Sequence, residues 1–304
     1  MNVLVTGGAG FLGSHLVERL VAAGERTSVI DSLERGRRTW IHEDARLHEL
    51  DIRDGPALTA AVAEIAPEVV VHLAAMHFIP AVDGAPEVAW DVNVNGTQML
   101  LDALAHHPPE LLVFASTAAV YPDRRGPIDE NCEPEPPDLY GRTKLAGEHL
   151  VTDFAGRTGT RCVSARIFNI IGRRETNPHV VPEIIGQLRG GSTSLRLGNI
   201  EPRRDYTDVV DVAAALHRLT ELPPNAPTAL NVGSGRSVSV GELVEACGEL
   251  LGRSIDIEVE PAKLRKTDRA ELIADSHLLR WVTGWEPTRS LRETLGELLN
   301  EAES

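Results

Sequence analysis

Cysteine is scarce in this chain of 304 residues, which contains three, at positions 132, 162 and 247. They lie far apart in the sequence and form no Cys-x-x-Cys pair. This spacing argues against a disulfide framework and against a zinc site. We therefore expect a reducing, cytoplasmic location and no bound metal.

Long apolar runs are also missing. The longest, at 68–76 and 111–120, are far too short to cross a bilayer. No basic and then apolar leader precedes the first predicted strand, so we expect no secretory signal. Acidic residues outnumber basic ones, and the formal net charge of −15 argues against nucleic acid as a partner. The sequence predicts a globular protein that binds neither membrane nor nucleic acid.

A glycine-dense stretch at the N-terminus is the strongest local motif. Residues 2–5 have the pattern of a buried strand, residues 6–10 that of a turn, and residues 11–23 that of a helix with apolar residues at helical spacing. Strand, glycine turn and helix in this order are the context of a dinucleotide-binding loop.

Each glycine of that stretch has its own task in such a loop. Gly7 permits the tight turn, Gly10 lets the backbone approach a pyrophosphate, and Gly13 lets the helix pack against the strand. The N–H groups of the first helical turn then hold the anion. Asp31 ends the next apolar run, where a carboxylate accepts hydrogen bonds from a ribose diol and repels a 2′-phosphate. NAD is therefore the expected cofactor.

Strand and helix patterns alternate through the first two thirds of the chain. This alternation predicts an α/β fold with a Rossmann-type, doubly wound parallel sheet. The expected strands are 2–5, 26–31, 46–51, 68–72, 111–116 and 161–166, and the expected helices are 11–23, 56–65, 86–106 and 138–157.

The last third is less regular and has no Ser/Gly linker, so we expect a smaller C-terminal α/β lobe packed directly on the nucleotide domain. Its expected helices are 180–188, 240–251 and 290–299, and its strands are 228–232 and 255–260. Residues 1–166, with a helix in 205–222, should form the NAD-binding domain, and residues 167–204 and 223–304 the lobe that binds substrate. The cleft should lie over the carboxyl ends of the parallel strands.

Three polar side chains could carry chemistry. Tyr140 and Lys144 are four residues apart, which places the phenol and the ammonium on one helix face. A nearby lysine cation and a bound nicotinamide would favour the phenolate and lower the pKa of the tyrosine. Thr117 follows a central strand, where its hydroxyl could contact a reacting oxygen. A solvated helix face and an ordinary turn remain the alternatives.

Taken together, these motifs make the chain resemble the extended short-chain dehydrogenase/reductase superfamily, in its branch of NAD-dependent nucleotide-sugar epimerases and dehydratases. The resemblance covers essentially the whole length. It is carried by residues 6–13, 31, 51–52, 73–75, 93–97, 116–121, 140 with 144, 166–169, 204–206, and 265 with 268 before 274–275.

The resemblance implies a role for each matching residue. Tyr140 becomes the catalytic base, Lys144 the ribose ligand that lowers its pKa, and Thr117 the third catalytic member. Arg204 and Arg265 become a pair that grips the pyrophosphate, which suits their forked donors. The implied cofactor contacts are Gly7, Gly10, Phe11, Leu12, Gly13, Asp31, Asp51, Ile52, Leu73, Ala74, Ala75, Asn93, Tyr140 and Lys144; the implied substrate contacts are Thr117, Asn169, Arg204, Arg265 and Leu272.

The residues after Thr117 bear on the type of reaction. The 4,6-dehydratases of this family carry Asp-Glu there, whereas Ala118 and Ala119 cannot move a proton. The resemblance therefore implies a 4-epimerase, acting on a nucleotide-sugar such as a UDP-hexose through a transient 4-keto sugar. A dehydratase or reductase of the same family, and a non-catalytic NAD-binding regulator, are the alternatives.

Several positions depart from the family pattern. Pro122 and Ser32 replace a usual glycine and asparagine, and the segment 76–80 is atypical. Within it His77 is either a second proton carrier or a neutral loop histidine. The arginines at 35, 37 and 38 leave NADP open as a cofactor.

The resemblance also implies a homodimer formed through the helices at 86–106 and 138–157. Leu100, Leu101 and Leu104 are candidates for that contact, with core packing as an equal explanation. Leu272 matches a position whose size gates N-acetylated sugars.

Overall fold

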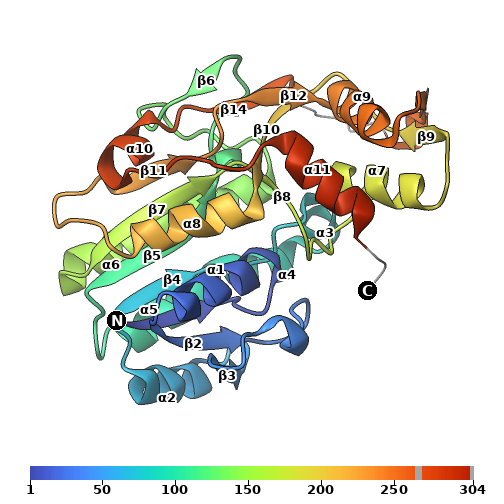
Figure 1. Cartoon of the computed structure of the whole chain (residues 1–304). Coiled ribbons are helices and arrows are strands. Elements are labelled where there is room, and N and C mark those ends of the chain that lie inside the picture. The colour runs from blue at the N-terminus through green and yellow to red at the C-terminus, as the bar shows by residue number, and fades with distance from the viewer. Residues whose placement is uncertain (264–268, 302–304) are drawn as a thin grey trace.

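A seven-stranded sheet forms the centre of the computed structural model, which describes residues 1–263 and 269–301 (Figure 1). All its neighbouring strands run parallel, and their order is β11-β7-β5-β4-β1-β2-β3. The strands are β1 (Asn2–Thr6), β2 (Arg26–Asp31), β3 (Arg46–Glu49), β4 (Val69–His72), β5 (Leu111–Thr117), β7 (Arg161–Ile167) and β11 (Ala229–Val232). The predicted Rossmann-type fold class is confirmed.

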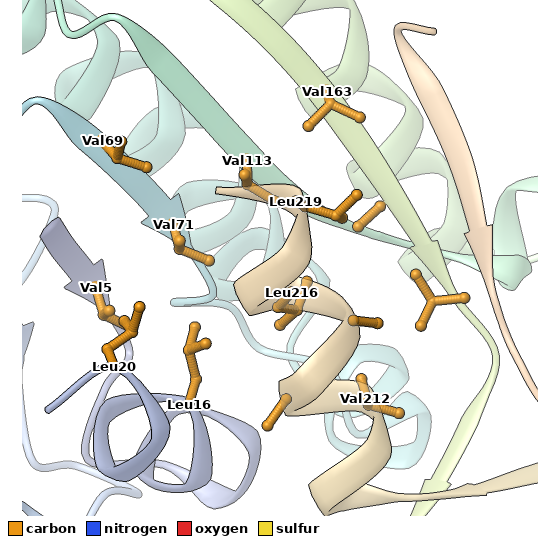
Figure 2. Close-up of a cluster of buried hydrophobic side chains, with 14 of the residues drawn as sticks. Val5, Leu16, Leu20, Val69, Val71, Val113, Val163, Val212, Leu216 and Leu219 are labelled. Carbon is orange, nitrogen blue, oxygen red and sulfur yellow. The ribbon is translucent and has the colours of Figure 1, made fainter. Parts of the chain in front are cut away.

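Apolar side chains cover both faces of this sheet. On one face, α1 (Phe11–Ala22) and α8 (Val209–Leu219) pack against alternate strand residues. Figure 2 shows Leu16 of α1 and Leu216 of α8 among Val5, Val71 and Val113. On the other face, the intervening strand residues pack against α2 (Gly55–Ile65), α5 (Gly96–Leu104) and α6 (Leu139–Thr158). Because both sides are covered, the central strands β1, β4 and β5 consist mainly of apolar residues such as valine and leucine.

The direction of winding reverses between β1 and β4, which lie side by side at the middle of the sheet. Loops that follow these two strands diverge to opposite sides and leave a crevice at their carboxyl ends. This reversal places the functional cavity where the N-terminal glycine loop and residues 73–75 meet.

A smaller lobe adds a second sheet, ordered β12-β10-β14-β6, with β8 beside β10. Asp205 is fully buried at its centre and accepts N–H groups from Ser234 (2.9 Å), Gly235 (2.8 Å) and Ala274 (3.1 Å). One carboxylate thus ties β10 to β14 and to the loop after β11. The further elements are β6 (Pro127–Ile128), β8 (Asn169–Ile171), β9 (Ser194–Leu197), β10 (Arg203–Asp208), β12 (Ser237–Ser239), β13 (Asp256–Val259), β14 (Glu271–Ala274), α7 (Val180–Arg189), α9 (Val240–Leu251), α10 (His277–Thr283) and α11 (Leu291–Asn300).

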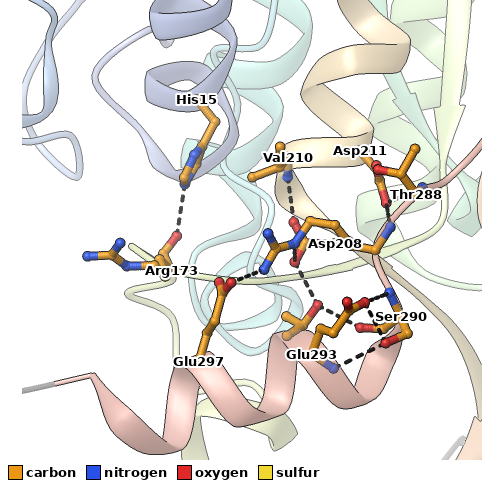
Figure 3. Close-up of polar contacts among 11 residues, drawn as sticks. His15, Arg173, Asp208, Val210, Asp211, Thr288, Ser290, Glu293 and Glu297 are labelled. Atoms are coloured by element: carbon orange, nitrogen blue, oxygen red, sulfur yellow. Dashed lines mark hydrogen bonds and ion pairs between the residues drawn. The ribbon is translucent and has the colours of Figure 1, made fainter.

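Two further carboxylates attach the C-terminal segment to α8 (Figure 3). Asp208 accepts the Arg289 Nε–H (2.9 Å) and the Thr294 hydroxyl (2.6 Å). Asp211 accepts the backbone N–H and the hydroxyl of Thr288 at 3.0 and 2.8 Å. These contacts hold α11 against the nucleotide domain without a linker between them.

Several elements differ from the sequence-based expectations. The helix expected at 86–106 consists of α4 (Pro86–Trp90), a π-helical turn (Asp91–Asn95) and α5. The strand expected at 228–232 is β11, an edge of the large sheet, although the expected division placed it in the lobe. β11 pairs with β7 over four residues because its apolar residues complete the core under α8 and α10. Helices α3 (Ile79–Gly84) and α10 (His277–Thr283) and the lobe strands β6, β8, β9, β10, β12 and β14 have no counterpart among the expected elements.

The remaining helices agree with expectation in place and type. In the described ranges, no helix combines the length and the apolar character that crossing a bilayer requires.

Candidate active site

A cavity of about 1690 Å³ extends from the N-terminal glycine loop, across the carboxyl ends of the strands, to the smaller lobe. It brings together nearly all the residues singled out from the sequence. Those that line it are Gly7, Gly10, Phe11, Leu12, Gly13, Asp31, Asp51, Ile52, Leu73, Ala74, Ala75, Thr117, Tyr140, Lys144, Asn169, Arg204 and Leu272. Arg265 lies outside the described residues.

Asn93 is the exception among the expected cofactor contacts, because it lies behind the cavity wall. Its buried amide accepts the N–H of Met76 (2.7 Å) and donates to the Met76 carbonyl (2.9 Å) and the Thr143 hydroxyl (3.0 Å). The side chain therefore holds the loop that lines the cavity, and its contribution to a cofactor site is indirect.

The glycine loop has no room for side chains. Gly7 has φ +73°, and a Cβ there would lie 2.7 Å from the Ala74 nitrogen. A Cβ on Gly13 would lie 2.1 Å from the Gly7 carbonyl oxygen. The backbone of the loop and the first turn of α1 is thus left open toward the cavity, which is the cradle that a pyrophosphate requires.

Asp31 lies at the end of β2, where a ribose carboxylate is expected. It accepts the N–H groups of Ala9 (2.9 Å) and Leu33 (2.8 Å), and burial raises the pKa of its carboxyl despite these bonds. Of the three nearby arginines, Arg35 lines the same cavity and the other two have partners elsewhere. Arg37 stacks over Trp40 at 5.0 Å and Arg38 pairs with Glu49. The site fits a free ribose diol, as in NAD, better than a 2′-phosphate.

Asp51 is held by a neighbour within its own turn. Arg53 Nη2 lies 2.5 Å from Asp51 Oδ2, and this hydrogen bond is the main reason that the pKa of the Asp51 carboxyl is lowered. Ile52 is buried against Gly96, whose added Cβ would lie 2.7 Å from it. Both residues line the end of the cavity next to the glycine loop, where the adenine end of a dinucleotide is expected.

Helix α6 presents Tyr140 and Lys144. Asp138 caps its N-terminus by accepting the Gly141 N–H at 2.7 Å. Burial raises the pKa of Tyr140 to about 12, and a hydrogen bond with the Thr117 side chain acts in the opposite direction. The structure thus brings Thr117 and Tyr140 together, as the sequence predicts.

Lys144 differs from expectation in its charge. It is 2% exposed, its Nζ lies 4.2 Å from the centre of the Phe114 ring, and burial lowers its pKa to about 7, with Glu148 opposing the shift. A lysine with so low a pKa is only partly protonated at neutral pH, and only its protonated form favours the phenolate of Tyr140. The expected effect requires something that keeps Lys144 charged.

The lobe supplies the other wall. Arg204 Nη1 donates to the Arg203 carbonyl (2.9 Å) and the Arg269 carbonyl (2.8 Å). Sequence reasoning did not single out Arg269, whose Nη2 donates to the Ala119 carbonyl at 2.9 Å and whose pKa is lowered by burial. Nothing local in the sequence marks it, because its partners are 150 residues away.

His77 also lines the cavity and faces the loop before α7. Its Nε2 lies 2.9 Å from Asn177 Nδ2, and its ring stacks with that of His179 at 6.4 Å. Burial lowers the pKa of His77, so the neutral imidazole is its form at neutral pH. This favours the neutral loop histidine over the second proton carrier.

Comparison with known proteins agrees with this geometry. Residues 3–233 match the model of the "NAD dependent epimerase/dehydratase family". A UDP-glucose 4-epimerase from Corynebacterium glutamicum is 34% identical over 98% of this chain and 94% of its own length. The crystal structure of the UDP-glucose 4-epimerase of Thermotoga maritima with UDP-glucose is similar, with a TM-score of 0.92, 30% identity, and coverage of 98% of this chain and 97% of that one.

A second solved structure has the same shape. The Thermus thermophilus UDP-glucose 4-epimerase in complex with NAD has a TM-score of 0.90 and 30% identity, and the match covers 99% of this chain and 98% of that one. With the glycine loop, Asp31 and the Tyr140–Lys144 helix lining one cavity, the chain belongs to the NAD dependent epimerase/dehydratase family.

Proposed function

We propose that the protein is an NAD-dependent nucleotide-sugar 4-epimerase whose substrate is a UDP-hexose. The observation that carries this proposal is the meeting of Thr117, Tyr140 and Lys144 in a cavity that continues from the glycine loop to Arg204. The related 4-epimerases with UDP-glucose and with NAD support the same assignment.

Tyr140 acts as the base on the C4 hydroxyl of the sugar, and Thr117 hydrogen-bonds the same oxygen. When bound, NAD⁺ supplies an acceptor, and later a donor, for the C4 hydride. Loss of the proton and the hydride converts C4–OH to C4=O, and the sugar becomes a 4-ketose. After the ketose turns, return of the hydride to the opposite face of C4 would invert its configuration, and Tyr140 returns the proton to the oxygen.

Anchoring of the nucleotide permits this rotation. Arg204 and Asn169 line the lobe side of the cavity, where a guanidinium and an amide suit a diphosphate. Arg265 is proposed as the second arginine. A firmly held diphosphate and a loosely held hexose let the sugar turn without leaving the site.

The segment after Thr117 favours epimerisation over dehydration. Ala118 and Ala119 are buried at the start of a 3₁₀ turn, and neither side chain can donate or accept a proton. A 4,6-dehydratase needs an acid and a base to remove water across C5 and C6. A reductase and a non-catalytic NAD-binding regulator are the other candidate functions. The presence of both Tyr140 and Lys144 disfavours the regulator.

Location and assembly complete the proposal: a cytoplasmic homodimer with the domain division predicted above, except that β11 belongs to the NAD-binding domain. Its three cysteines are free, as in a reducing compartment. Leu100, Leu101 and Leu104 are core residues on the inner face of α5, so they do not serve a dimer contact. Val88 and Trp90 of α4 are 47% and 43% exposed and offer an apolar surface beside α6.

A screen of nucleotide-sugars by proton NMR tests the activity. We expect UDP-glucose or UDP-galactose to be converted into a mixture of the two, seen as an axial/equatorial change at C4. Run in deuterated water, the reaction should leave no deuterium on carbon. Deuterium at C3 or C5 would instead identify an enolising or dehydrating enzyme and overturn the proposal.

Leu272 is expected to control acceptance of N-acetylated sugars. It lines the cavity on β14 and packs in a cluster with Tyr121 and Phe168. If N-acetylhexosamines are substrates, Leu272→Tyr should lower their kcat/KM about tenfold relative to the plain hexose, because the larger ring fills space that the acetyl group needs. The volume-matched Leu272→Met is the control, and equal losses on both sugars would reject the gating role.

A further inference from the structure

A buried ion pair lies directly beneath the proposed catalytic residues. Arg166 Nε donates to Glu148 Oε1 at 3.0 Å, and its Nη2 donates to Oε2 at 2.7 Å. The Ser116 hydroxyl also donates to Glu148 Oε1. Glu148 and Arg166 are 7% and 6% exposed, so this carboxylate lies almost entirely out of solvent.

The pair touches each element that presents a catalytic side chain. Glu148 lies four residues after Lys144 and eight after Tyr140, on the same face of α6. Ser116 precedes Thr117 in β5 and lies opposite Arg166 of β7 in the sheet register. One carboxylate thus joins α6, β5 and β7 immediately below the reacting groups.

The other end of Arg166 is held by neutral groups. Its Nη1 donates to the Tyr121 hydroxyl (3.1 Å), which donates to the Asn231 Oδ1 (2.7 Å). The Asn231 amide in turn donates to the Ile128 carbonyl (2.8 Å). Lys144 and Arg166 are therefore two buried cations near one carboxylate. Because one buried carboxylate compensates both positive charges, its removal would leave two buried cations without a compensating charge.

Among the residues that the structure describes, the other neighbours of Lys144 do not supply negative charge. The Phe114 ring of β5 contacts its Nζ. His72 of β4 is neutral, since burial and then Lys144 lower its pKa to about 3. The His77 imidazole on the loop after β4 is neutral as well, and Tyr140 is a protonated phenol. Glu148 is the group that opposes the effect of burial on the ammonium.

We propose that Glu148 is a positioning residue that keeps Lys144 protonated beside Tyr140 and holds Thr117 in place through Ser116. This inference rests on the roles proposed above for Tyr140 and Lys144. A charged Lys144 favours the phenolate form of Tyr140 by Coulomb attraction, whereas a neutral amine does not. Removing the negative charge of Glu148 should therefore disfavour the phenolate form of Tyr140, although Tyr140 itself is unchanged.

The composition of the chain allows a direct test, because lysine occurs only at 144, 263 and 266. Protein labelled with ¹³C-lysine gives few Cε signals, and Lys263→Arg and Lys266→Arg assign that of Lys144 by elimination. Following the Lys144 signal against pH in the NAD-loaded protein measures the pKa of its amine. This readout needs no turnover.

Three variants separate charge from packing. In Glu148→Gln the Lys144 pKa should fall by about one unit, and the alkaline limb of kcat/KM should move to lower pH by the same amount. Glu148→Asp disturbs the same pair but keeps both charges, so the titration of Lys144 should stay close to that of the unchanged protein. Arg166→Lys also keeps both charges but adds a lysine signal of its own, so it is compared by its kcat/KM profile alone, which should stay in place. The Lys144 pKa should thus change only when the negative charge at position 148 is removed. A pair with a merely structural role would not produce this dependence on charge.

A control comes from a second buried carboxylate that is remote from Lys144. Asp208→Asn breaks the contacts to Arg289 and Thr294 and should lower Tm without moving the Lys144 titration. The proposal is overturned if Glu148→Gln leaves that titration in place, or if all the variants move it alike. If Glu148→Gln fails to fold, Glu148→Asp provides the test. A Lys144 titration at clearly lower pH in Glu148→Asp than in the unchanged protein would overturn the proposal. An unchanged titration would support it. Absence of turnover on every nucleotide-sugar would reject the proposed function while leaving the NMR result interpretable.

Discussion

Replacing Tyr140 by phenylalanine should lower kcat roughly 10³-fold while NAD stays bound. The change removes one oxygen, the proposed base, and keeps the ring in its partly buried place at the start of α6. General base catalysis contributes about 10²- to 10⁴-fold in rate, so a loss in the middle of that range, about 4 kcal/mol, is expected. The dinucleotide cradle at Gly7, Gly10 and Gly13 is left intact.

Two measurements on the Tyr140→Phe protein check this expectation. The rate of 4-epimerisation is followed by proton NMR at saturating substrate, and the NAD content is determined by its absorbance after denaturation. Thr117→Val is the companion variant, since it removes the hydrogen-bond partner of the phenol and should cost less than the loss of the base. A Tyr140→Phe protein that turned over as fast as the unchanged one would remove Tyr140 from the mechanism.

Replacing Gly13 by alanine should weaken NAD binding roughly 100-fold. The added Cβ would lie 2.1 Å from the Gly7 carbonyl oxygen and 2.7 Å from the Gly8 Cα. Both are backbone atoms, so no flexible side chain can move aside, and α1 must shift away from the glycine loop. Overpacking of this kind costs about 3 kcal/mol, which corresponds to a roughly 100-fold weaker NAD affinity if it falls on the binding site.

Gly156→Ala provides the matched control. Gly156 lies within α6, and an added Cβ there meets nothing within 4 Å. Alanine is favoured over glycine in a helix interior by roughly 0.5–1 kcal/mol, so Tm should rise slightly and the Kd for NAD should not change. Titration with NAD by calorimetry compares the two proteins, and wild-type affinity in Gly13→Ala would falsify the role assigned to the loop.

Part of this protein can be deduced from neighbouring residues alone. The glycine turn at 7–13, the alternation of strands and helices, and the Tyr140–Lys144 spacing are local patterns, because backbone sterics and the helix repeat act over a few residues. The fold class and the family follow from these patterns. The catalytic and binding roles remain predictions, although the cavity gathers nearly all the residues concerned.

Other features arise from contacts between distant segments. Local patterning identified a strand at 228–232 but could not show which sheet it joins, and the pairing of β11 with β7 decides that. Asn93 looked like a cavity residue but bonds to Met76 and Thr143 behind the wall. Arg269 reaches the Ala119 carbonyl from the other end of the chain.

The charge states of Tyr140 and Lys144 also depend on contacts between distant segments. The sequence by itself determined that a phenol and an ammonium share one helix face, since that depends only on the helical repeat. Tertiary structure decided that both are so enclosed that the pKa of Tyr140 rises to about 12 and that of Lys144 falls to about 7. Burial causes both shifts, and it is opposed by the Thr117 hydrogen bond at Tyr140 and by the carboxylate of Glu148 at Lys144. These effects come from the packing of α6 against β5 and β7, which no local pattern encodes.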